Sequence, residues 1–451
     1  MTSAISVDDR RRATLERLHG EPATPRSNAR TSRDARTSRV ARTSRDARTG
    51  GDLRERRRPA AQPAARRANR SPRGHTRSKR VAPEVLGPPT GTFYAIAGVV
   101  SVLVMLGLVM VLSASAVTEA NQGHSPYRVF VRQAMWAGLG LVSLGLMVKI
   151  SYRRWQRLVI PITLLAVTAM AAPFAPGIGS TVNGARSWIR LGPLSAQPSE
   201  FLKIAVVILA ADLLTRRRDD LGDRYATLFP LGLIATVGAG LCLVQGDLGA
   251  AIVLSAIVFS VAWVAGVPLV PLSGMAAGAT GAALLFVVSS QFRIDRFTAF
   301  MNMAEEKDHL AYQTYQGYLG MASGGLSGSG IGGSNAKLGF LPYAHSDFIF
   351  AVIADELGLI GTVAVIGGFV MLVALGVQTA IAAPDRFGML LAGGIASWFG
   401  VQAIVNIGGV VGFMPVTGLT LPFFSAGGSS LFVSMTAAGL LLSVARRINA
   451  R

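Results

Sequence analysis

The sequence predicts an all-α polytopic membrane protein with about ten transmembrane helices and a basic N-terminal tail. Of the 451 residues, 51% are apolar and only 15% are charged, against about 25% charged in soluble domains. The formal net charge is nevertheless +20, so the apolar and the basic residues must lie in different parts of the chain. The single cysteine, Cys242, excludes an internal disulfide and a cysteine-based zinc site.

The basic residues gather in residues 1–90. This segment holds 23 Lys and Arg against 9 Asp and Glu, a balance of +14, and it has no apolar periodicity. A hexad, Ala-Arg-Thr-Ser-Arg-Asp, recurs with variations from Ala29, Ala35, Ala41 and Ala47. Such a segment cannot bury enough apolar surface to offset its ordering entropy, which predicts a disordered tail. No short apolar core with a cleavage site follows a basic start, which argues against a signal peptide.

Residues 91–451 form the predicted transmembrane domain, because ten apolar runs approach the length of about 20 residues that a bilayer helix needs. The runs are Phe93–Ala116, Val131–Val148, Leu158–Ile178, Phe201–Leu214, Leu228–Val244, Leu248–Val264, Leu269–Val288, Phe348–Val377, Gly388–Gly412 and Leu431–Val444. Basic clusters at residues 149–157, 216–218 and 446–447 recur on one side of the runs, as does the tail. The positive-inside rule places that side, with both termini, in the cytoplasm.

Five segments then face outward: Val117–Phe130, Gly179–Ser199, Gln245–Asp247, Ser289–Asp347 and Phe413–Ser430. The fourth is the informative one, because it has 59 residues where the other connections are tight. Loops longer than about 15 residues are usually functional or disordered. The six aromatic residues that this loop carries in its first half suit a chain lying at the membrane interface.

Charged side chains within apolar spans face a bundle interior or mark function. Glu200 and Lys203 lie one helical turn apart on one face, where they either contact substrate or simply neutralise one another. Asp347 precedes a span, which favours an N-cap. His345 and Asp347 are only two candidate metal ligands, so the sequence predicts no metal site there. The other polar residues at span positions are Asp212, Asp247, Asp355, Glu356 and Asn406.

One glycine-rich segment, Gly328–Gly333, matches the pattern G-x-G-x-x-G. A dinucleotide site would need a preceding strand, a following helix and an acidic residue further on. The surrounding sequence provides none of these convincingly. We therefore interpret the segment as backbone that approaches a ligand or another helix closely.

Four stretches resemble the SEDS family (shape, elongation, division and sporulation), the FtsW/RodA group. They are Leu112-Ser-Ala-Ser-Ala116; Asn183-Gly-Ala-Arg186-Ser-Trp188-Ile-Arg190 with Gln197-Pro-Ser-Glu200 and Lys203; Ala344-His345-Ser-Asp347-Phe-Ile-Phe with Glu356-Leu-Gly358; and Pro415-Val-Thr417-Gly418-Leu-Thr-Leu-Pro422 with Ser425-Ala-Gly-Gly-Ser429-Ser430. They lie within residues 93–447, in the family's order. The form Leu419-Thr-Leu-Pro422 is closer to FtsW than to RodA, which favours division over elongation.

The resemblance implies a peptidoglycan glycosyltransferase that polymerises lipid II, works with a class B penicillin-binding protein and other division proteins, and resides in the cytoplasmic membrane at the septum. It also implies an essential acidic residue in the fourth outer loop. The family pattern there is Arg-x-x-x-Phe/Trp-x-Asn-Pro-x-x-Asp, and this chain departs from it after Arg296 and Asn302. Spacing favours Glu306 as the catalytic residue, and residue type favours Asp308.

The chemistry of a lipid diphosphate donor sets what else the site needs. The diphosphate is a good leaving group, so one base and positive charge on the departing phosphates suffice. Arg186, Arg190, Arg293 and Lys337 are candidates for the phosphates, since guanidinium forks suit phosphate oxygens. A divalent cation, Mg²⁺ or Mn²⁺, could share that charge, although the sequence shows no closed ligand set. The motif residues that we expect at the substrate are Glu200, Lys203, His345, Asp347, Ser425 and Ser429.

Two other classes of function remain open from the residues alone. A transporter that flips lipid II would also place charged residues within spans. A scaffold could use the basic tail to bind nucleic acid or anionic lipid, but a solvated cytoplasmic arm is the simpler interpretation, so we expect no nucleic-acid partner. Polymer formation by purified protein in detergent separates a polymerase from a flippase.

Overall fold

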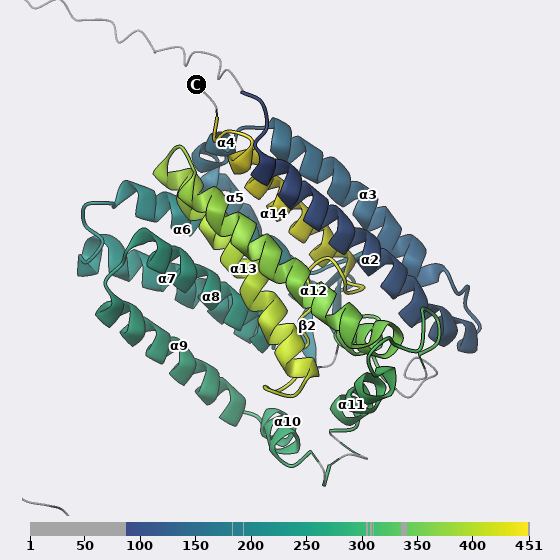
Figure 1. Cartoon of the computed structure of the whole chain (residues 1–451). Helices are drawn as coiled ribbons and strands as arrows, with labels where there is room; N and C mark the ends of the chain where they lie inside the picture. Colours follow the sequence, from purple (N-terminus) through teal and green to yellow (C-terminus); the bar gives the residue numbers. More distant parts are fainter. Residues whose placement is uncertain are drawn as a thin grey trace, which may run out of the picture. The chain divides into compact units, whose positions relative to one another are not determined.

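The computed structural model describes residues 87–449, other than 183, 193, 304, 307–308, 310 and 335–340 (Figure 1). The chain divides into two units, Met1–Ser78 and Lys79–Arg451, and every described residue belongs to the second. The predicted disordered tail therefore lies outside the described residues, as do Asp308 and Lys337.

Most of the described chain is helical, as the composition predicts. The longer helices are α2 (Gly91–Asn121), α3 (Arg128–Lys149), α5 (Val159–Ala169), α6 (Pro198–Arg216), α7 (Phe229–Val244), α8 (Leu248–Ala265), α9 (Leu269–Val288), α10 (Gln291–Met301), α11 (Tyr312–Gly324), α12 (Ile349–Ile381), α13 (Arg386–Val410) and α14 (Gly428–Ala445). The short ones are α4 (Tyr152–Arg157), η2 (Ala172–Phe174) and the π-helical turn η3 (Arg224–Leu228).

The polytopic helical architecture is confirmed, but the count of candidate spans is lower than the expected ten. In the described part of the chain, eight helices are long and apolar enough to cross a membrane by length and composition. The other two expected runs correspond to the shorter apolar stretch Val159–Phe174 and to α6, which carries four charged residues. Helix α6 fits the sequence signals for a helix start, since Pro198 occupies its first turn with Glu200 close behind.

Small residues let the innermost helices approach closely. Helices α13 and α14 are the most buried of the spans, and α14 packs mainly against α3. A Cβ at Gly439 would lie 2.8 Å from the carbonyl oxygen of Leu144, and one at Gly140 would lie 2.6 Å from the sulfur of Met435. Because lipid tails are as apolar as leucine, such close van der Waals packing is what holds membrane helices together.

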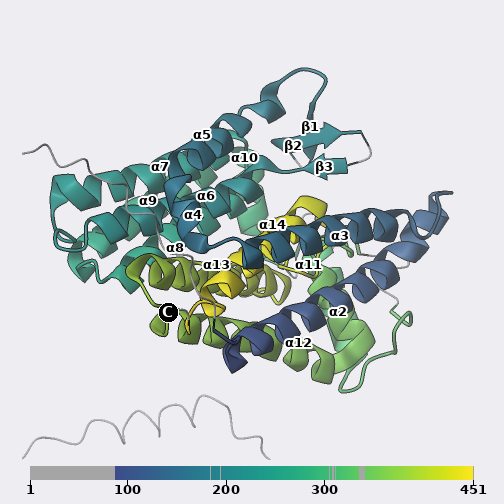
Figure 2. The ribbon, with the colours of Figure 1, turned by 90° about the horizontal axis from the view of Figure 1, so that it is seen from above.

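The second outward segment folds differently from a simple loop. Strands β1 (Gly179–Val182), β2 (Ala185–Leu191) and β3 (Leu194–Ala196) form a three-stranded antiparallel sheet in the order β1-β2-β3. Ile189 pairs with Gly179 on one side and with Ala196 on the other. Seen from above, the sheet lies at the same end of the bundle as α10 and α11 (Figure 2).

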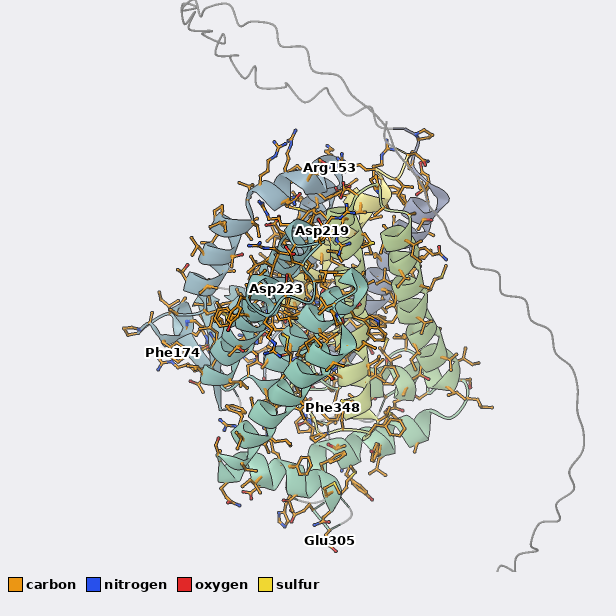
Figure 3. All side chains as sticks on the ribbon, turned by 90° about the vertical axis from the view of Figure 1, so that its left-hand side faces the viewer. Arg153, Phe174, Asp219, Asp223, Glu305 and Phe348 are labelled. Carbon is orange, nitrogen blue, oxygen red and sulfur yellow. The ribbon has the colours of Figure 1, made fainter. Side chains whose placement is uncertain are left out.

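The long fourth segment is also structured, since it contains α10 and α11. Figure 3 shows Glu305 and Phe348 at one end of the bundle and Arg153, Asp219 and Asp223 at the other. The loop end and the end that carries the basic clusters are therefore opposite.

The glycine-rich segment closes a break in helix α12. Gly358 has a φ of 66°, which interrupts the helix, so carbonyl groups there lose their usual partners. The amides of Ser329 and Gly330 donate to the carbonyl oxygens of Asp355 and Glu356 at 2.9 and 3.0 Å. A Cβ at Gly328 would lie 2.1 Å from the Glu356 carbonyl oxygen. The interpretation of this segment as closely approaching backbone is confirmed.

Candidate functional site

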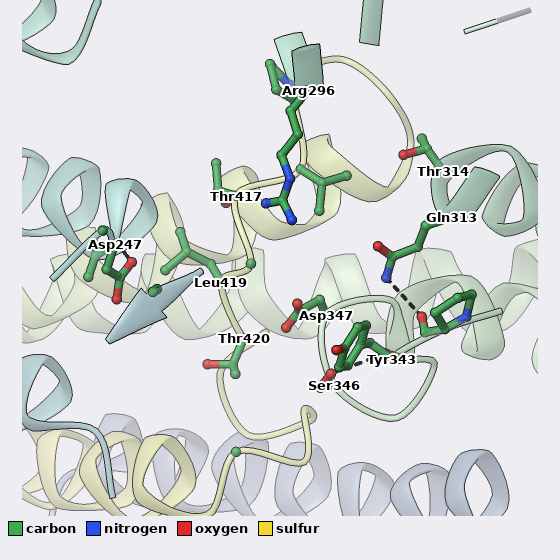
Figure 4. A pocket seen from close by; sticks show the side chains of 18 of the residues that line it. Asp247, Arg296, Gln313, Thr314, Tyr343, Ser346, Asp347, Thr417, Leu419 and Thr420 are labelled. Atoms are coloured by element: carbon green, nitrogen blue, oxygen red, sulfur yellow. Dashed lines mark hydrogen bonds between the residues drawn. The ribbon is translucent and has the colours of Figure 1, made fainter. Parts of the chain in front are cut away.

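A cavity of about 470 Å³ opens at the loop end of the bundle. Its walls come from segments far apart in the sequence: β2, the start of α6, the turn between α7 and α8, helices α10 and α11, and residues 342–347 and 415–427. Three acidic residues line it, and Figure 4 shows two of them, Asp247 and Asp347, on different walls. The three carboxylates differ in their hydrogen-bond and ion-pair partners.

Glu200 lines the cavity and forms an ion pair with Lys203. Lys203 Nζ lies 2.8 Å from both carboxylate oxygens of Glu200. The ammonium also donates to Gln402 Oε1 at 2.9 Å and sits 5.3 Å from the centre of the Trp398 ring. Lys203 is 0% exposed and does not line the cavity. The interpretation of this pair as mutually neutralising is thus confirmed, although the Glu200 side still faces the cavity.

Asp247 uses its carboxylate to hold the fold. One oxygen accepts the amide of Ala250 at 2.9 Å and so caps the start of α8. The other accepts Gln197 Nε2 at 2.7 Å, which joins the start of α6 to this turn. Both oxygens therefore have protein donors, as a structural carboxylate requires.

Asp347 is the acid that differs. In the described part of the chain, no side chain or amide donates a hydrogen bond to its carboxylate. Burial raises the pKa of Asp347 to about 7, even though the neighbouring Arg296 lowers it, and Asp247 raises it further. Figure 4 shows the Arg296 side chain pointing from its helix toward Asp347. A carboxyl with this pKa can both accept and release a proton near neutral pH.

The prediction that Asp347 caps a helix is wrong. Helix α12 begins at Ile349, and its N-cap is Phe348, which makes no side-chain capping bond. The preceding turn explains this, because Tyr343 has a φ of 55° and the chain coils there before the helix starts. Asp347 consequently precedes the cap by one residue, and its carboxylate reaches the cavity instead of the helix amides.

The arginines nominated for the phosphates lie elsewhere. Arg186 donates to the carbonyl oxygens of Pro173 and Phe174 at 3.0 and 3.3 Å. Arg293 donates to the Phe286 carbonyl and the Ser289 hydroxyl at the end of α9. Arg190 is exposed, and none of the three lines the cavity. The bonds to the Pro173 and Phe174 carbonyl oxygens account for Arg186, because they hold its guanidinium group away from the cavity.

Glu306, the acid that spacing favours, does not line the cavity either. Glu306 is partly exposed and is not among the lining residues, although Met303 and His309 on either side of it are. Asp308 lies outside the described residues. The structure therefore brings the loop to the rim of the cavity without bringing the Glu306 side chain into it.

Two further nominated residues, Ser425 and Ser429, join backbone segments behind the cavity wall. Ser425 donates to the Ser346 carbonyl and accepts the Leu421 amide, both at 2.7 Å. Ser429 accepts the amide of Gln197 at 3.1 Å. His345 does not line the cavity, and burial lowers its pKa, while Glu119 raises it.

Sequence reasoning missed Arg296 as the cavity's cation. In the sequence, Arg296 served only as the first position of the loop pattern. Its spacing of four residues from Phe300 places both on one face of a helix, and this signal could have identified it. In the structure both residues line the cavity from α10. The cavity has three further polar residues in its wall: Gln313, Thr417 and Thr420. Gln313 donates to the Pro342 carbonyl oxygen at 2.9 Å.

A resident metal ion does not fit the residues that the structure describes. Among them, no three His, Cys, Asp or Glu side chains gather as a ligand group. Both oxygens of Asp247 are already used by protein donors.

The fold and the site together define a class: a helical membrane protein with a polar, charged cavity built from the loops at one end of its bundle. A family profile described as cell cycle protein, covering FtsW, RodA and SpoVE, matches residues 94–450. The chain belongs to this family.

Relatives and solved structures agree with that membership. The chain is 37% identical over 347 residues to a probable peptidoglycan glycosyltransferase FtsW of Geobacter sp. (strain M18), covering 77% of this chain and 95% of that one. It is 37% identical over 362 residues to the FtsW of Mycobacterium tuberculosis, covering 80% and 69%.

The fold is similar to solved members of the family. The crystal structure of Thermus thermophilus RodA matches with a TM-score of 0.59 at 31% identity, covering 79% of this chain and 97% of that one. A chain from a structure of a peptidoglycan synthase complex, concerned with coordination of polymerization and crosslinking, matches with a TM-score of 0.64 at 29% identity, covering 79% and 98%.

Proposed function

We propose that this chain is a peptidoglycan glycosyltransferase that polymerises lipid II into glycan strands at the outer face of the cytoplasmic membrane. The observation that carries the proposal is the cavity at the loop end, where Arg296 and Asp347 meet. An arginine suits the diphosphate of a lipid-linked donor. A carboxylate beside it suits removal of a proton from the acceptor sugar.

The two ends of the bundle support the proposed orientation. The basic clusters that predict a cytoplasmic side lie opposite the cavity (Figure 3). With that side in the cytoplasm, both termini are cytoplasmic, and the cavity opens where lipid II is consumed outside. The resemblance to FtsW supports a role at the division septum.

We also propose a protein partner for this chain. One solved relative is part of a peptidoglycan synthase complex concerned with polymerization and crosslinking. We therefore propose a class B penicillin-binding protein, a transpeptidase, as the partner of this chain, together with other division proteins. A divalent cation, Mg²⁺ or Mn²⁺, would arrive with the diphosphate and share its charge.

The loop acids enter the proposal through the family resemblance. Glu306 holds the position of the family's essential acid, and Asp308 lies two residues further on. Replacing either by its amide, Glu306→Gln or Asp308→Asn, is expected to abolish polymerisation while leaving expression unchanged. Retention of wild-type turnover by both variants would show that the base lies elsewhere in the cavity.

The experiment that tests the function uses the full chain, purified with its partner in detergent, and lipid II as substrate. A polymerase yields glycan strands, detected as a ladder on a gel after the partner's transpeptidase is blocked. A flippase yields none, because detergent removes the two compartments that flipping requires. Absence of polymer under these conditions would contradict the proposed function.

A further inference from the structure

One buried glutamine of helix α13 joins two walls of the cavity. Gln402 is 0% exposed and does not line the cavity itself. Its side-chain oxygen accepts Lys203 Nζ at 2.9 Å and Trp398 Nε1 at 2.7 Å, and its side-chain nitrogen donates to the Thr420 carbonyl oxygen at 2.8 Å. Lys203 in turn pairs with Glu200. The amide therefore connects helix α6 with the loop that carries Thr420.

The partners of this amide determine its orientation. An ammonium group and an indole N–H can only donate, so the atom that they share must be the acceptor oxygen. Turning the amide over would place its NH2 group against the donors of Lys203 and Trp398, and its oxygen against the Thr420 carbonyl oxygen. All three polar contacts would then be repulsive. Gln402 is thus held in one orientation, with its nitrogen toward the cavity wall.

Both segments that Gln402 connects face the cavity. Glu200 and Thr420 line it, and Figure 4 shows the Thr420 side chain at its wall. One turn further along α13, Asn406 Nδ2 donates to the Leu419 carbonyl oxygen at 2.6 Å. Gln402 and Asn406 therefore hold consecutive carbonyl groups of the same wall from one face of the helix. Through Lys203, Gln402 also holds the wall on α6.

We propose that Gln402 is a positioning residue for polymerisation, which keeps Glu200 and the Thr420 segment at the spacing that bound lipid II needs. It acts without touching the substrate. Its oxygen fixes the ammonium group that holds the Glu200 carboxylate, and its nitrogen fixes the backbone of the other wall. This inference rests on the proposed function and leaves the loop acid as the catalytic residue.

Burial explains why the fold depends on this one amide. Lys203 is 0% exposed and Trp398 is 1% exposed, so water does not replace an acceptor that both have lost. Without the amide, the ammonium group must shift to find another partner, and the Glu200 carboxylate shifts with it. A displacement of about 1 Å at a site can lower a rate by ~100-fold.

The first test replaces the amide with an apolar side chain. Gln402→Leu removes all three bonds, and we expect kcat/KM for lipid II to fall by ~10-fold or more in the reconstituted polymerase assay. The matched control is Gln156→Leu, which removes the bond from Gln156 Nε2 to Asp212 Oδ1 at the basic end of the bundle. Both variants should unfold at a lower temperature than wild type, whereas the control should keep wild-type kinetics.

A double-mutant cycle separates positioning from stability. If Gln402 acts through Glu200, the double variant Gln402→Leu/Glu200→Gln should lose less than the product of the two single losses in kcat/KM, by ~5-fold or more. The losses of Gln156→Leu and Glu200→Gln should simply multiply. If Gln402→Leu gives no folded protein, Gln402→Glu takes its place, because a carboxylate keeps the acceptor for Lys203 but cannot donate to Thr420.

Each outcome decides between the alternatives. If wild-type protein makes no polymer, the proposed function fails and this inference fails with it. If wild type polymerises and the folded Gln402 variant keeps more than about a third of its kcat/KM, or if the losses multiply, Gln402 serves only the fold and the function stands. A tenfold loss that is coupled to Glu200 supports the positioning role.

Discussion

Two regions of the molecule place a carboxylate at helix α12, one before its start and one at its break, and the partners of the two carboxylates differ. Ahead of the helix, Asp347 has no donor among the described residues and faces a cavity. At the break within the helix, Asp355 accepts the hydroxyls of Ser323 and Ser334 at 2.7 and 2.5 Å. Its neighbour Glu356 lies 2.6 and 2.8 Å from the Ser113 hydroxyl.

This difference separates an acid that is paired within the fold from one that lines a cavity. A buried acid whose oxygens are satisfied by the protein stabilises the break in the helix. Asp347, whose backbone is held by Asn406, leaves its carboxylate oxygens accessible from the cavity. Sequence alone shows both as acids at span positions, whereas their partners distinguish them. The predictions below test the two regions, starting from the largest expected effect.

The strongest perturbation is Gly358→Val at the helix break. Gly358 has a φ of 66°, and a Cβ there would lie 2.4 Å from the Gly328 amide nitrogen and 2.5 Å from the Leu326 carbonyl oxygen. A β-branched residue cannot adopt that conformation without strain. We expect no monodisperse folded protein on gel filtration. Gly367→Ala in the same helix, where a Cβ meets nothing within 4 Å, is the control and should behave as wild type.

Ser334→Ala is expected to destabilise the fold by about 1–3 kcal/mol, because it leaves the Asp355 Oδ2 atom without this donor. Thermal unfolding in detergent measures the change. Ser273→Ala, which removes a hydroxyl that bonds only within the exposed helix α9, provides the reference. Equal unfolding temperatures for the two variants would show that the Asp355 network contributes nothing to stability.

Asp347→Asn should stabilise the protein at high pH and not at low pH. The folded-state pKa of Asp347, about 7, lies above the unfolded value, so the folded state binds more protons between about pH 4 and pH 7. The aspartate therefore lowers stability as pH rises through that window. Asparagine cannot ionise, so the unfolding temperature of the variant should exceed that of wild type at pH 8 and match it at pH 4. An equal difference at both values would contradict the raised pKa.

The smallest effect is expected for Arg186→Gln. The Arg186 side chain holds the carbonyl groups of Pro173 and Phe174 and does not line the cavity. The variant should change KM for lipid II by less than about threefold and lower stability by about 1 kcal/mol. Arg296→Gln, which removes the cavity's arginine, should raise KM by ~10-fold or more. Similar KM values for the two variants would show that Arg296 contributes no more to lipid II binding than Arg186 does.

The fold could be predicted largely because bilayer spans follow from length and apolar composition, which a sequence displays directly. The ten expected runs correspond to helices, although α12 extends to Ile381, beyond its predicted end, and contains the break at Gly358. The sheet of residues 179–196 was not predicted. Its pairing depends on contacts between short strands, and no strong alternation marks those strands in the sequence.

The site was harder to predict because function depends on where side chains point. Arg186 belongs to a family motif yet does not line the cavity, because its guanidinium group is bonded to the carbonyl oxygens of Pro173 and Phe174. Asp347 looks like a cap because it precedes a helix, and only the turn at Tyr343 shows that it is displaced from the cap position. Spacing within a motif identifies the family, whereas local backbone geometry decides which member of the motif reaches the substrate.

Helix α9 has almost no protein around it, with only Leu272 buried among its residues. Its 20 residues span about 30 Å, close to the hydrocarbon thickness of a bilayer, so lipid rather than packing determines its tilt. Helix α10, which carries Arg296, follows it after two residues. We therefore expect the activity of this enzyme to depend on the acyl-chain length of the surrounding lipids. A thinner or thicker membrane would change the tilt of α9 and so move the Arg296 guanidinium group relative to the Asp347 carboxylate.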